Sequence, residues 1–208
     1  MKHSVFIRGR QRSIKVEASG SILIFSTVVM LMFFILQSYL VRAQIFTFNR
    51  QLIDSSLTAA MLGAEVIKLN EFADTGDVIF VDNTKDIFSD ILKYNLGTDS
   101  NFRLTREGIT DNIIIEEYIV YNKIKTSTGY YIQEIRDNNN GKHTINHSEG
   151  EVIKVATTDG EKIITEASLY ARISFVINVG GYREGGDNSK SSMYKRLALS
   201  RLTSVKTK

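Results

Sequence analysis

The chain has 208 residues, of which 43% are hydrophobic and 24% are charged, and its formal net charge at pH 7 is +3. It has no cysteine, which excludes disulfide bonds, cysteine zinc sites and thiol catalysis. Basic residues cluster ahead of a long apolar segment, at Lys2, Arg8, Arg10, Arg12 and Lys15, so the net basicity reflects membrane orientation and we expect no nucleic-acid partner.

An apolar segment without any Asp, Glu, Lys, Arg or His extends from Ala18 to Leu40. Its 23 residues rise ~1.5 Å each as an α-helix and reach ~35 Å, enough to cross a hydrocarbon core of ~30 Å with some tilt. A soluble core helix of this length would carry a polar stripe, and this segment has none. We therefore predict a transmembrane helix at residues 13–41 that anchors the protein in the cell membrane and contacts lipid.

The basic leader at residues 1–12 predicts the orientation of that helix. Positive charge on the short flank stays in the cytoplasm, so we expect a cytoplasmic N-terminus, a single membrane pass and an extracytoplasmic remainder. A cleavable secretory signal is the alternative, but its apolar core is typically about 7–15 residues long and ends in small residues. The segment here is longer and continues into Gln37–Arg42, which favours an anchor that is retained.

The residues from Arg12 to Ser19 read Arg-Ser-Ile-Lys-Val-Glu-Ala-Ser. This string resembles the start of TadE-type class III prepilin-like proteins, in which a basic leader precedes a Gly-Ser-Ile-Thr-Val-Glu-Ala-Ser-like string and an apolar helix. The family usually has Gly where this chain has Arg12, and often has Pro near the position of Leu23. The resemblance implies that a prepilin peptidase cuts between Arg12 and Ser13 on the cytoplasmic side.

Such a cut would make Glu17 the fifth residue of the mature chain. The resemblance implies that this acid pairs with the free amino group of a neighbouring subunit, where two opposite charges stabilise each other better than either charge buried alone. The alternative is an interfacial glutamate that stays among the lipid headgroups. A charge at the bilayer centre costs ~2.5–3.5 kcal/mol on insertion scales, and less near the interface.

The helical pattern continues beyond Leu40. Apolar residues recur at three- or four-residue spacing, and from residue 42 to residue 69 the only helix-weakening residue is Gly63, which costs ~1 kcal/mol relative to Ala. We predict an amphipathic continuation at residues 42–72, so that one helix runs from about Val16 to Phe72. A transmembrane helix followed by a separate helix is the alternative.

Residues 73–208 predict a single α+β domain outside the membrane. A turn is expected at Asp74–Asp77, a short strand at Val78–Val81, and a helix that begins at Asn83 or Thr84 and stops at Gly97. Residues 98–107 predict a loop or a weak strand.

From residue 112 the apolar period changes from that of a helix to that of a strand. Two hairpins are expected, the second around an Asp-Gly turn, followed by a strongly alternating strand. Residues 193–205 suit a helix or a closing strand, and we favour the strand. The expected strands are Ile113–Ile124, Tyr130–Ile135, Glu151–Thr157, Lys162–Thr165 and Leu169–Val179, with a long turn at Asp137–Lys142 and a glycine-rich loop at Gly180–Ser192.

No group of residues predicts catalysis, a metal site or a cofactor. His143 and His147 have metal-ligand spacing only on a helix, and their neighbours predict a loop. Glu116 and Glu117 adjoin on a predicted strand and should face opposite sides, so they cannot act as a catalytic pair. The segment Gly180–Gly186 lacks the Gly-Lys-Ser/Thr ending of a phosphate loop. We therefore expect a protein that is not an enzyme.

The expected fold is a pilin-like α+β architecture, a long N-terminal helix with a C-terminal antiparallel β-rich head. The resemblance implies a pseudopilin or minor pilin, a structural or assembly component of a type IV-like (Tad/Flp) pilus or related secretion machine. Its partners would be other pilin-like subunits, an assembly platform and a prepilin peptidase. One alternative is a single-pass extracytoplasmic binding, sensor or accessory domain, although about 15 cytoplasmic residues leave no room for an output domain. Another is a membrane-anchored enzyme.

Overall fold

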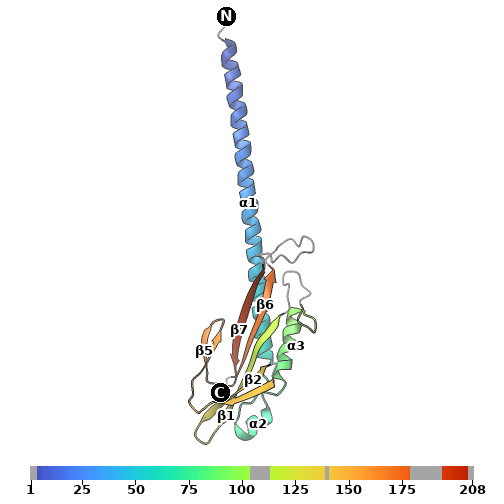
Figure 1. Cartoon of the computed structure of the whole chain (residues 1–208), viewed down its shortest axis with the longest axis vertical. Coiled ribbons are helices and arrows are strands. Elements are labelled where there is room, and N and C mark those ends of the chain that lie inside the picture. Colours follow the sequence, from blue (N-terminus) through green and yellow to red (C-terminus); the bar gives the residue numbers. More distant parts are fainter. Residues whose placement is uncertain (1–3, 104–112, 139–140, 179–193, 206–208) are drawn as a thin grey trace. The chain divides into compact units, whose positions relative to one another are not determined.

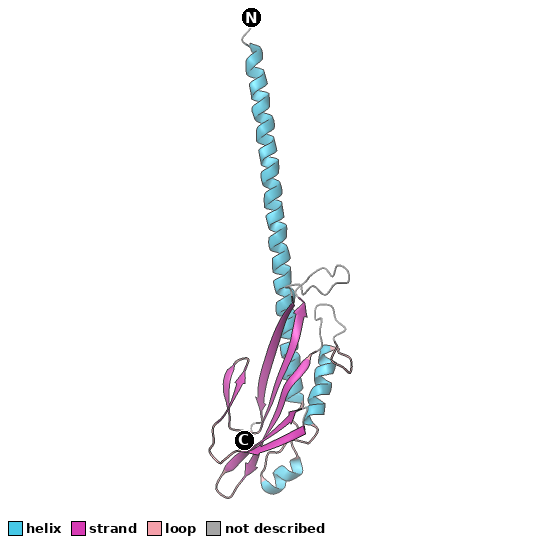
Figure 2. Cartoon of the chain, in the orientation of Figure 1, coloured by secondary structure: helices cyan, strands magenta, loops and turns pink. Residues whose placement is uncertain are grey.

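The computed structural model describes residues 4–103, 113–138, 141–178 and 194–205, with the backbone alone for residues 4–19, 138, 178 and 194–196. By its internal packing the chain divides into two units, Met1–Gln44 and Ile45–Lys208. Figure 1 gives the order of the elements and Figure 2 their type, three helices and a set of antiparallel strands.

Helix α1 spans Ser4–Gly63 and accounts for all of the described first unit. Its stretch from Gly20 onward is long and apolar enough to cross a membrane, and the most apolar part of it is entirely exposed. Its large apolar side chains are exposed, for example Ile24 (68%), Leu31 (57%) and Ile35 (70%). The predicted long apolar N-terminal helix is therefore confirmed, with the length and composition of a membrane anchor or a signal sequence.

The predicted end of this helix at Phe72 is wrong, because α1 ends at Gly63 and a separate helix α2 spans Leu69–Thr75. Between the two helices, the backbone of residues 66–68 forms hydrogen bonds with residues 79–81. Lys68 N–H donates to the carbonyl of Ile79 (2.8 Å), and Val81 N–H donates to that of Val66 (2.9 Å). Such bonds between separated segments leave no trace in local apolar spacing, which is why the sequence pattern favoured one helix.

Gly63 also lies where α1 meets helix α3, which spans Thr84–Leu96. A Cβ atom at Gly63 would stand 2.4 Å from Cδ1 of Ile91 on α3, so the glycine permits close packing of the two helices. Helix α3 is confirmed as predicted, with Asn83 at the N-cap position. Gly97 ends it in the left-handed conformation (φ +63°), which glycine adopts without strain.

The five-stranded sheet has the order β3-β2-β1-β6-β7, and all its neighbouring strands are antiparallel. The expected antiparallel β-rich head is confirmed, as is the strand at the C-terminal segment. The strands of this sheet are β1 Ile114–Lys125, β2 Tyr130–Asn138, β3 Gly141–Asn146, β6 Ser168–Asn178 and β7 Tyr194–Ser204.

Strand β3 replaces the turn and loop that were expected after Asp137, so that interpretation is wrong. Strand β2 continues to Asn138, and β3 pairs back onto it from Gly141, whose φ of +113° favours glycine. Every residue of β3 is exposed, so the strand has no apolar alternation to reveal it. Only the pairing with β2 shows that this polar segment is a strand at the edge of the sheet.

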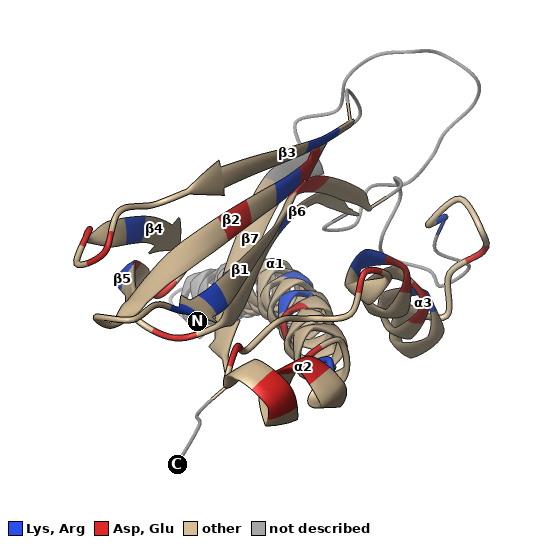
Figure 3. Cartoon of the chain, turned by 90° about the horizontal axis from the view of Figure 1, so that it is seen from below, with Lys and Arg blue, Asp and Glu red and all other residues tan. Residues whose placement is uncertain are grey.

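The main core lies between the inner face of the sheet and the helices α1 and α3, which lie on the same side of the sheet (Figure 3). The predicted alternation of β6 is confirmed, because its odd-numbered residues from Leu169 to Ile177 are all buried in this core. The helices contribute fully buried apolar side chains: Ile53, Leu57, Ala60 and Met61 from α1, and Phe88, Leu92 and Leu96 from α3.

The outer face of the sheet carries a second, smaller core. The predicted hairpin is confirmed as β4 Ile153–Thr157 and β5 Gly160–Ile164, in which Thr157 pairs with Gly160 across the two-residue turn Thr158-Asp159. Apolar residues of this hairpin join those that point outward from β1 and β6. The buried members are Ile119, Tyr121, Ile153, Val155, Ile164 and Tyr170.

Candidate functional site

The predicted cleavage and assembly residues Arg12, Ser13 and Glu17 all lie on α1, whose backbone is helical from Ser4. Their side chains fall outside the described part of the structure. The structure describes the side chains of the apolar part of α1 that follows, from Gly20 onward. The cut between Arg12 and Ser13 and the pairing of Glu17 with a neighbouring subunit therefore remain predictions.

Two hydroxyl groups in the apolar part of α1 form hydrogen bonds within the helix itself. The hydroxyls of Ser26 and Thr27 both donate to the carbonyl of Leu23, at 2.9 and 2.8 Å. In a hydrocarbon environment each polar group needs a partner within the segment itself, and these hydroxyls have one. These two hydroxyls are thus compatible with contact to lipid.

Farther along, α1 changes from an exposed helix to a core element of the second unit. Phe48 is 64% exposed, whereas Asn49 is 8% exposed and Ile53, one turn later, is fully buried. One continuous helix therefore carries both an exposed apolar surface and part of the core of the folded domain. That combination is the main structural feature that bears on function.

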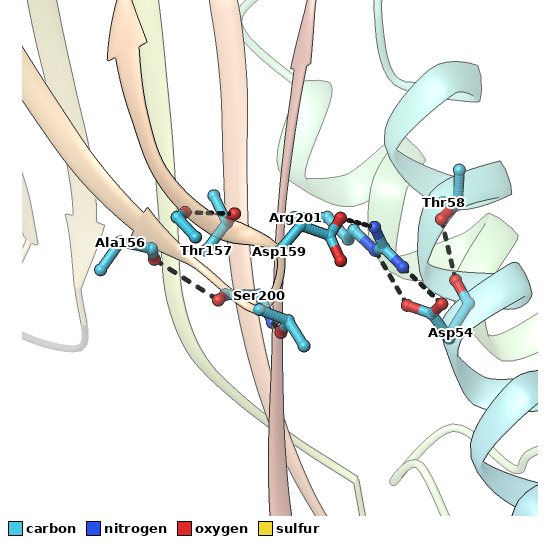
Figure 4. Close-up of polar contacts among 9 residues, drawn as sticks. Asp54, Thr58, Ala156, Thr157, Asp159, Ser200 and Arg201 are labelled. Atoms are coloured by element: carbon cyan, nitrogen blue, oxygen red, sulfur yellow. Dashed lines mark hydrogen bonds and ion pairs between the residues drawn. The ribbon is translucent and has the colours of Figure 1, made fainter.

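Arg201 on β7 forms ion pairs with Asp54 on α1 and with Asp159 in the β4–β5 turn (Figure 4). Its Nε donates to Oδ1 of Asp54 at 2.9 Å, a second guanidinium nitrogen contacts Oδ2 of Asp54, and a third contacts Asp159. The hydrogen bonds to Asp54 raise the pKa of Arg201, so the guanidinium stays charged. Bidentate pairs of this kind are stronger and more specific in geometry than single contacts.

The same turn closes part of the edge of the sheet at β7. Thr158 N–H donates to the Ser200 carbonyl (3.1 Å), and Ser200 N–H donates to the Thr158 hydroxyl (2.8 Å). An open strand edge is a template for pairing with other chains, and these bonds occupy part of it. The sequence predicted the hairpin, but it did not show that the hairpin turn docks on β7.

His147, considered as a metal ligand from its spacing, lies between two carboxylates instead. Its Nε2 is 2.9 Å from Oε2 of the buried Glu134, and its Nδ1 is 3.1 Å from Oε1 of Glu151. Burial alone lowers the pKa of His147, but the hydrogen bonds to Glu151 and Glu134 outweigh it and raise the pKa above 6.5. Arg136 also contacts Glu134, so this buried acid lies against a guanidinium group as well as the imidazole ring of His147.

His143 lies on β3 and does not join His147 in a ligand set. Among the described residues, no group of three or more His, Cys, Asp or Glu side chains could hold a metal ion. The glycine-rich segment Gly180–Gly186 lies outside the described residues. Lysine and arginine residues are interspersed with acidic ones over the helices and strands of the domain (Figure 3).

The prediction that Glu116 and Glu117 face opposite sides is wrong. The pairing of β1 with β6 shifts between Ile115 and Glu117, so a β-bulge interrupts the alternation. Ile115 and Tyr118 both pack in the inner core although they are three residues apart, which places both glutamates toward the outer face. There Glu116 Oε2 pairs with Nε of Arg172 at 2.9 Å.

Sequence reasoning missed the contacts of Arg201 with Asp54 because the two residues are 147 positions apart and neither belongs to a motif. The one signal in the sequence was that Arg201 stands among alternate residues of β7 that otherwise face the core, such as Leu197 and Leu199. That signal does not identify Asp54 as its partner. Comparison with known proteins finds no matching family model, no matching curated protein and no matching solved structure.

Proposed function

We propose that this protein is a membrane-anchored structural or assembly subunit of a type IV-like (Tad/Flp) pilus or a related secretion machine, similar to the TadE-type pseudopilins and minor pilins. The observation that carries the proposal is the dual character of α1. The helix is exposed and apolar over a membrane-spanning length, and from Ile53 onward one face of the same helix is buried in the core of an antiparallel α+β domain. A subunit that must stay in a membrane and present a folded domain needs both features.

In this proposal the apolar part of α1 contacts lipid before assembly and other subunits after it. The leader at residues 1–12 stays on the cytoplasmic side, and the domain lies outside the membrane. Glu17 pairs with the amino group of Ser13 on a neighbouring subunit once the leader has been removed. The gain comes from bringing two opposite charges together in an environment where each alone is costly.

Replacement of Glu17 by Gln tests this function, because it removes the charge while it keeps the size of the side chain. We expect the variant to reach the membrane and to keep the melting temperature of the domain. We expect cross-linking in intact cells to show a loss of its contacts with other subunits. Ser19→Ala, two residues farther along the same segment, is the matched control and should assemble normally.

Two results would contradict the proposal. One is normal cross-linked assembly of the Glu17→Gln variant, which would show that the acid has no role between subunits. The other is a lowered melting temperature with normal assembly, which would make Glu17 a folding residue. A chain that is recovered only as a free monomer in its native membrane would favour an anchored accessory domain instead.

A further inference from the structure

The segment between β3 and β4 connects the edge of the sheet with the hairpin on its outer face. It contains a tight turn, in which Glu151 N–H donates to the carbonyl of Ser148 at 3.1 Å. Gly150 within this turn has a φ of +78°, a left-handed conformation that glycine adopts without strain. Strand β4 begins two residues after Glu151. The contacts that hold this turn in place therefore also hold the start of the β4–β5 hairpin.

Glu151 closes the turn through both oxygens of its carboxylate. Its Oε2 accepts a hydrogen bond from Ser148 N–H at 2.9 Å, and its Oε1 lies 3.1 Å from Nδ1 of His147. On the other side of the same ring, Nε2 of His147 lies 2.9 Å from Oε2 of Glu134 on β2. His147 N–H donates to the carbonyl of Ile132 on β2 at 3.0 Å, so its backbone is fixed as well. The His147 side chain thus bridges β2 and the turn before β4.

Both nitrogens of the His147 ring face a carboxylate oxygen. A neutral imidazole carries a single N–H, so it donates to one carboxylate and presents a lone pair to the other. Only the protonated ring donates on both sides, and the two contacts together therefore require it. Burial lowers the pKa of His147, but the hydrogen bonds to Glu151 and Glu134 outweigh burial and raise the pKa above 6.5.

The two carboxylates differ in what they can do when the ring loses a proton. Glu134 is 3% exposed, so water cannot replace a donor that it loses, and it also contacts Arg136. Tyr121 lies opposite Glu134 on β1, and burial and the Glu134 charge raise the pKa of its hydroxyl, which stays neutral. The Glu151 side chain is 47% exposed and can be hydrated. The remaining N–H of the ring therefore stays with Glu134, and the contact with Glu151 is lost.

Other attachments of this region do not depend on the histidine. Oε2 of Glu149 accepts a hydrogen bond from the Thr128 hydroxyl, in the turn between β1 and β2, at 2.8 Å. At the far end of the hairpin, the β4–β5 turn is attached to β7 by the hydrogen bonds and the ion pair described above. The start of the hairpin lies between these attachments, where the contact between His147 and Glu151 holds it.

We propose that His147 is a pH-sensitive latch of the β4–β5 hairpin. The protonated ring fixes the turn before β4 to β2, and the neutral ring releases Glu151. The start of the hairpin then opens more readily, while its turn stays attached to β7. Opening exposes buried residues of the outer core, among them Ile153 at the start of β4, which is 8% exposed in the closed form. The latch uses residues of the second unit alone and is independent of the proposed assembly.

The chain has no cysteine, so one introduced thiol reports opening without background. Ile153→Cys places that thiol beneath the start of the hairpin. Its rate of reaction with a neutral maleimide is measured on the full-length protein in lipid nanodiscs, between about pH 6 and pH 9. Division by the rate of free cysteine at each pH corrects for ionisation of the thiol. We expect the corrected rate to rise about threefold or more as NMR shows the His147 ring losing its proton.

His147→Gln in the same background is the decisive variant, because its side chain does not titrate. We expect a corrected rate that is high and constant over the whole pH range. Glu151→Gln changes an exposed residue and should also remove the pH dependence, because an amide can donate to the ring or accept from it. His143→Gln is the matched control, exposed on β3 four residues earlier, and should keep the pH dependence.

Three results would overturn the inference. The first is a corrected rate that does not change with pH when His147 is present. The second is a pH dependence that persists in His147→Gln and in Glu151→Gln. The third is an equal rise for a thiol introduced at Ile173, which is fully buried in the inner core, because it would show unfolding of the whole domain. None of these results bears on Glu17 or on subunit assembly, so the two proposals fail separately.

Discussion

Arg201 and Asp54 form a bidentate ion pair that joins the last strand of the sheet to the helix with which the domain begins, 147 residues earlier in the chain. Both side chains are partly shielded, at 25% and 30% exposed. Asp159 in the β4–β5 turn contacts the same guanidinium, so one side chain holds three elements together. The stability of the domain should therefore depend on this residue more than on its other surface pairs.

Arg201→Ala is expected to lower the free energy of unfolding by about 1–3 kcal/mol, because it leaves two carboxylates near each other without a cation. Chemical denaturation of the full-length protein measures the change. The matched control is Arg172→Ala, which removes a more exposed pair with Glu116 and should cost at most about 1 kcal/mol. Equal losses in the two variants would show that the Arg201 contacts are ordinary surface pairs.

Gly63→Ala should not bring the gain of about 1 kcal/mol that the same change brings in an exposed helix. The new Cβ would stand 2.4 Å from Cδ1 of Ile91, so the Ile91 side chain must move. Ile91→Val removes that Cδ1 atom, and the double variant should be more stable than the sum of the single changes predicts. A double-mutant cycle measured by thermal unfolding gives this coupling. Strict additivity would contradict the close packing of the two helices.

Stability should fall as pH rises through the region where His147 loses its proton. The folded-state pKa of His147 is raised by its hydrogen bonds to Glu151 and Glu134. The contribution of the protonated ring is therefore complete below the unfolded pKa of about 6.5 and is lost as pH rises through the folded pKa. Melting temperatures of the protein and of His147→Gln, measured between about pH 6 and pH 8.5, should converge toward the upper end.

His143→Gln is the control for that experiment, because His143 is exposed on β3, four residues from His147. This variant should follow the pH dependence of the unchanged protein. If His147→Gln shows the same dependence as well, the contacts of His147 with Glu134 and Glu151 do not control the stability of this region.

The intact mass of the membrane-extracted protein tests processing. If the leader is removed as in prepilin-like proteins, the mass should correspond to a chain that begins at Ser13 and keeps its apolar helix. A plain anchor would give the mass of the uncut chain, which would contradict the cut but leave the architecture unchanged. A chain cut beyond residue 40 would be recovered outside the membrane and would contradict both the anchor and the pilin proposal.

The apolar part of α1, helix α3 and most strands were predictable because their signals are local. The apolar helix follows from an uninterrupted run of apolar residues, and α3 follows from a short periodic stretch that ends at Gly97. The β4–β5 hairpin follows from its Asp-Gly turn, and β6 follows from the alternation that starts at Leu169. In each case residues close in sequence carry the whole pattern.

Only the tertiary structure decided the features that depend on distant partners. Gly63 ends α1 where residues 66–68 bond to residues 79–81, and β3 is a strand only because β2 pairs with it. His147 meets the buried Glu134 because the segment after β3 stays alongside β2. By itself, the sequence determined a membrane-length apolar helix followed by an α+β domain. Hydrogen bonds between strands and ion pairs connect residues that are far apart in sequence, and the local spacing of apolar residues does not depend on those contacts.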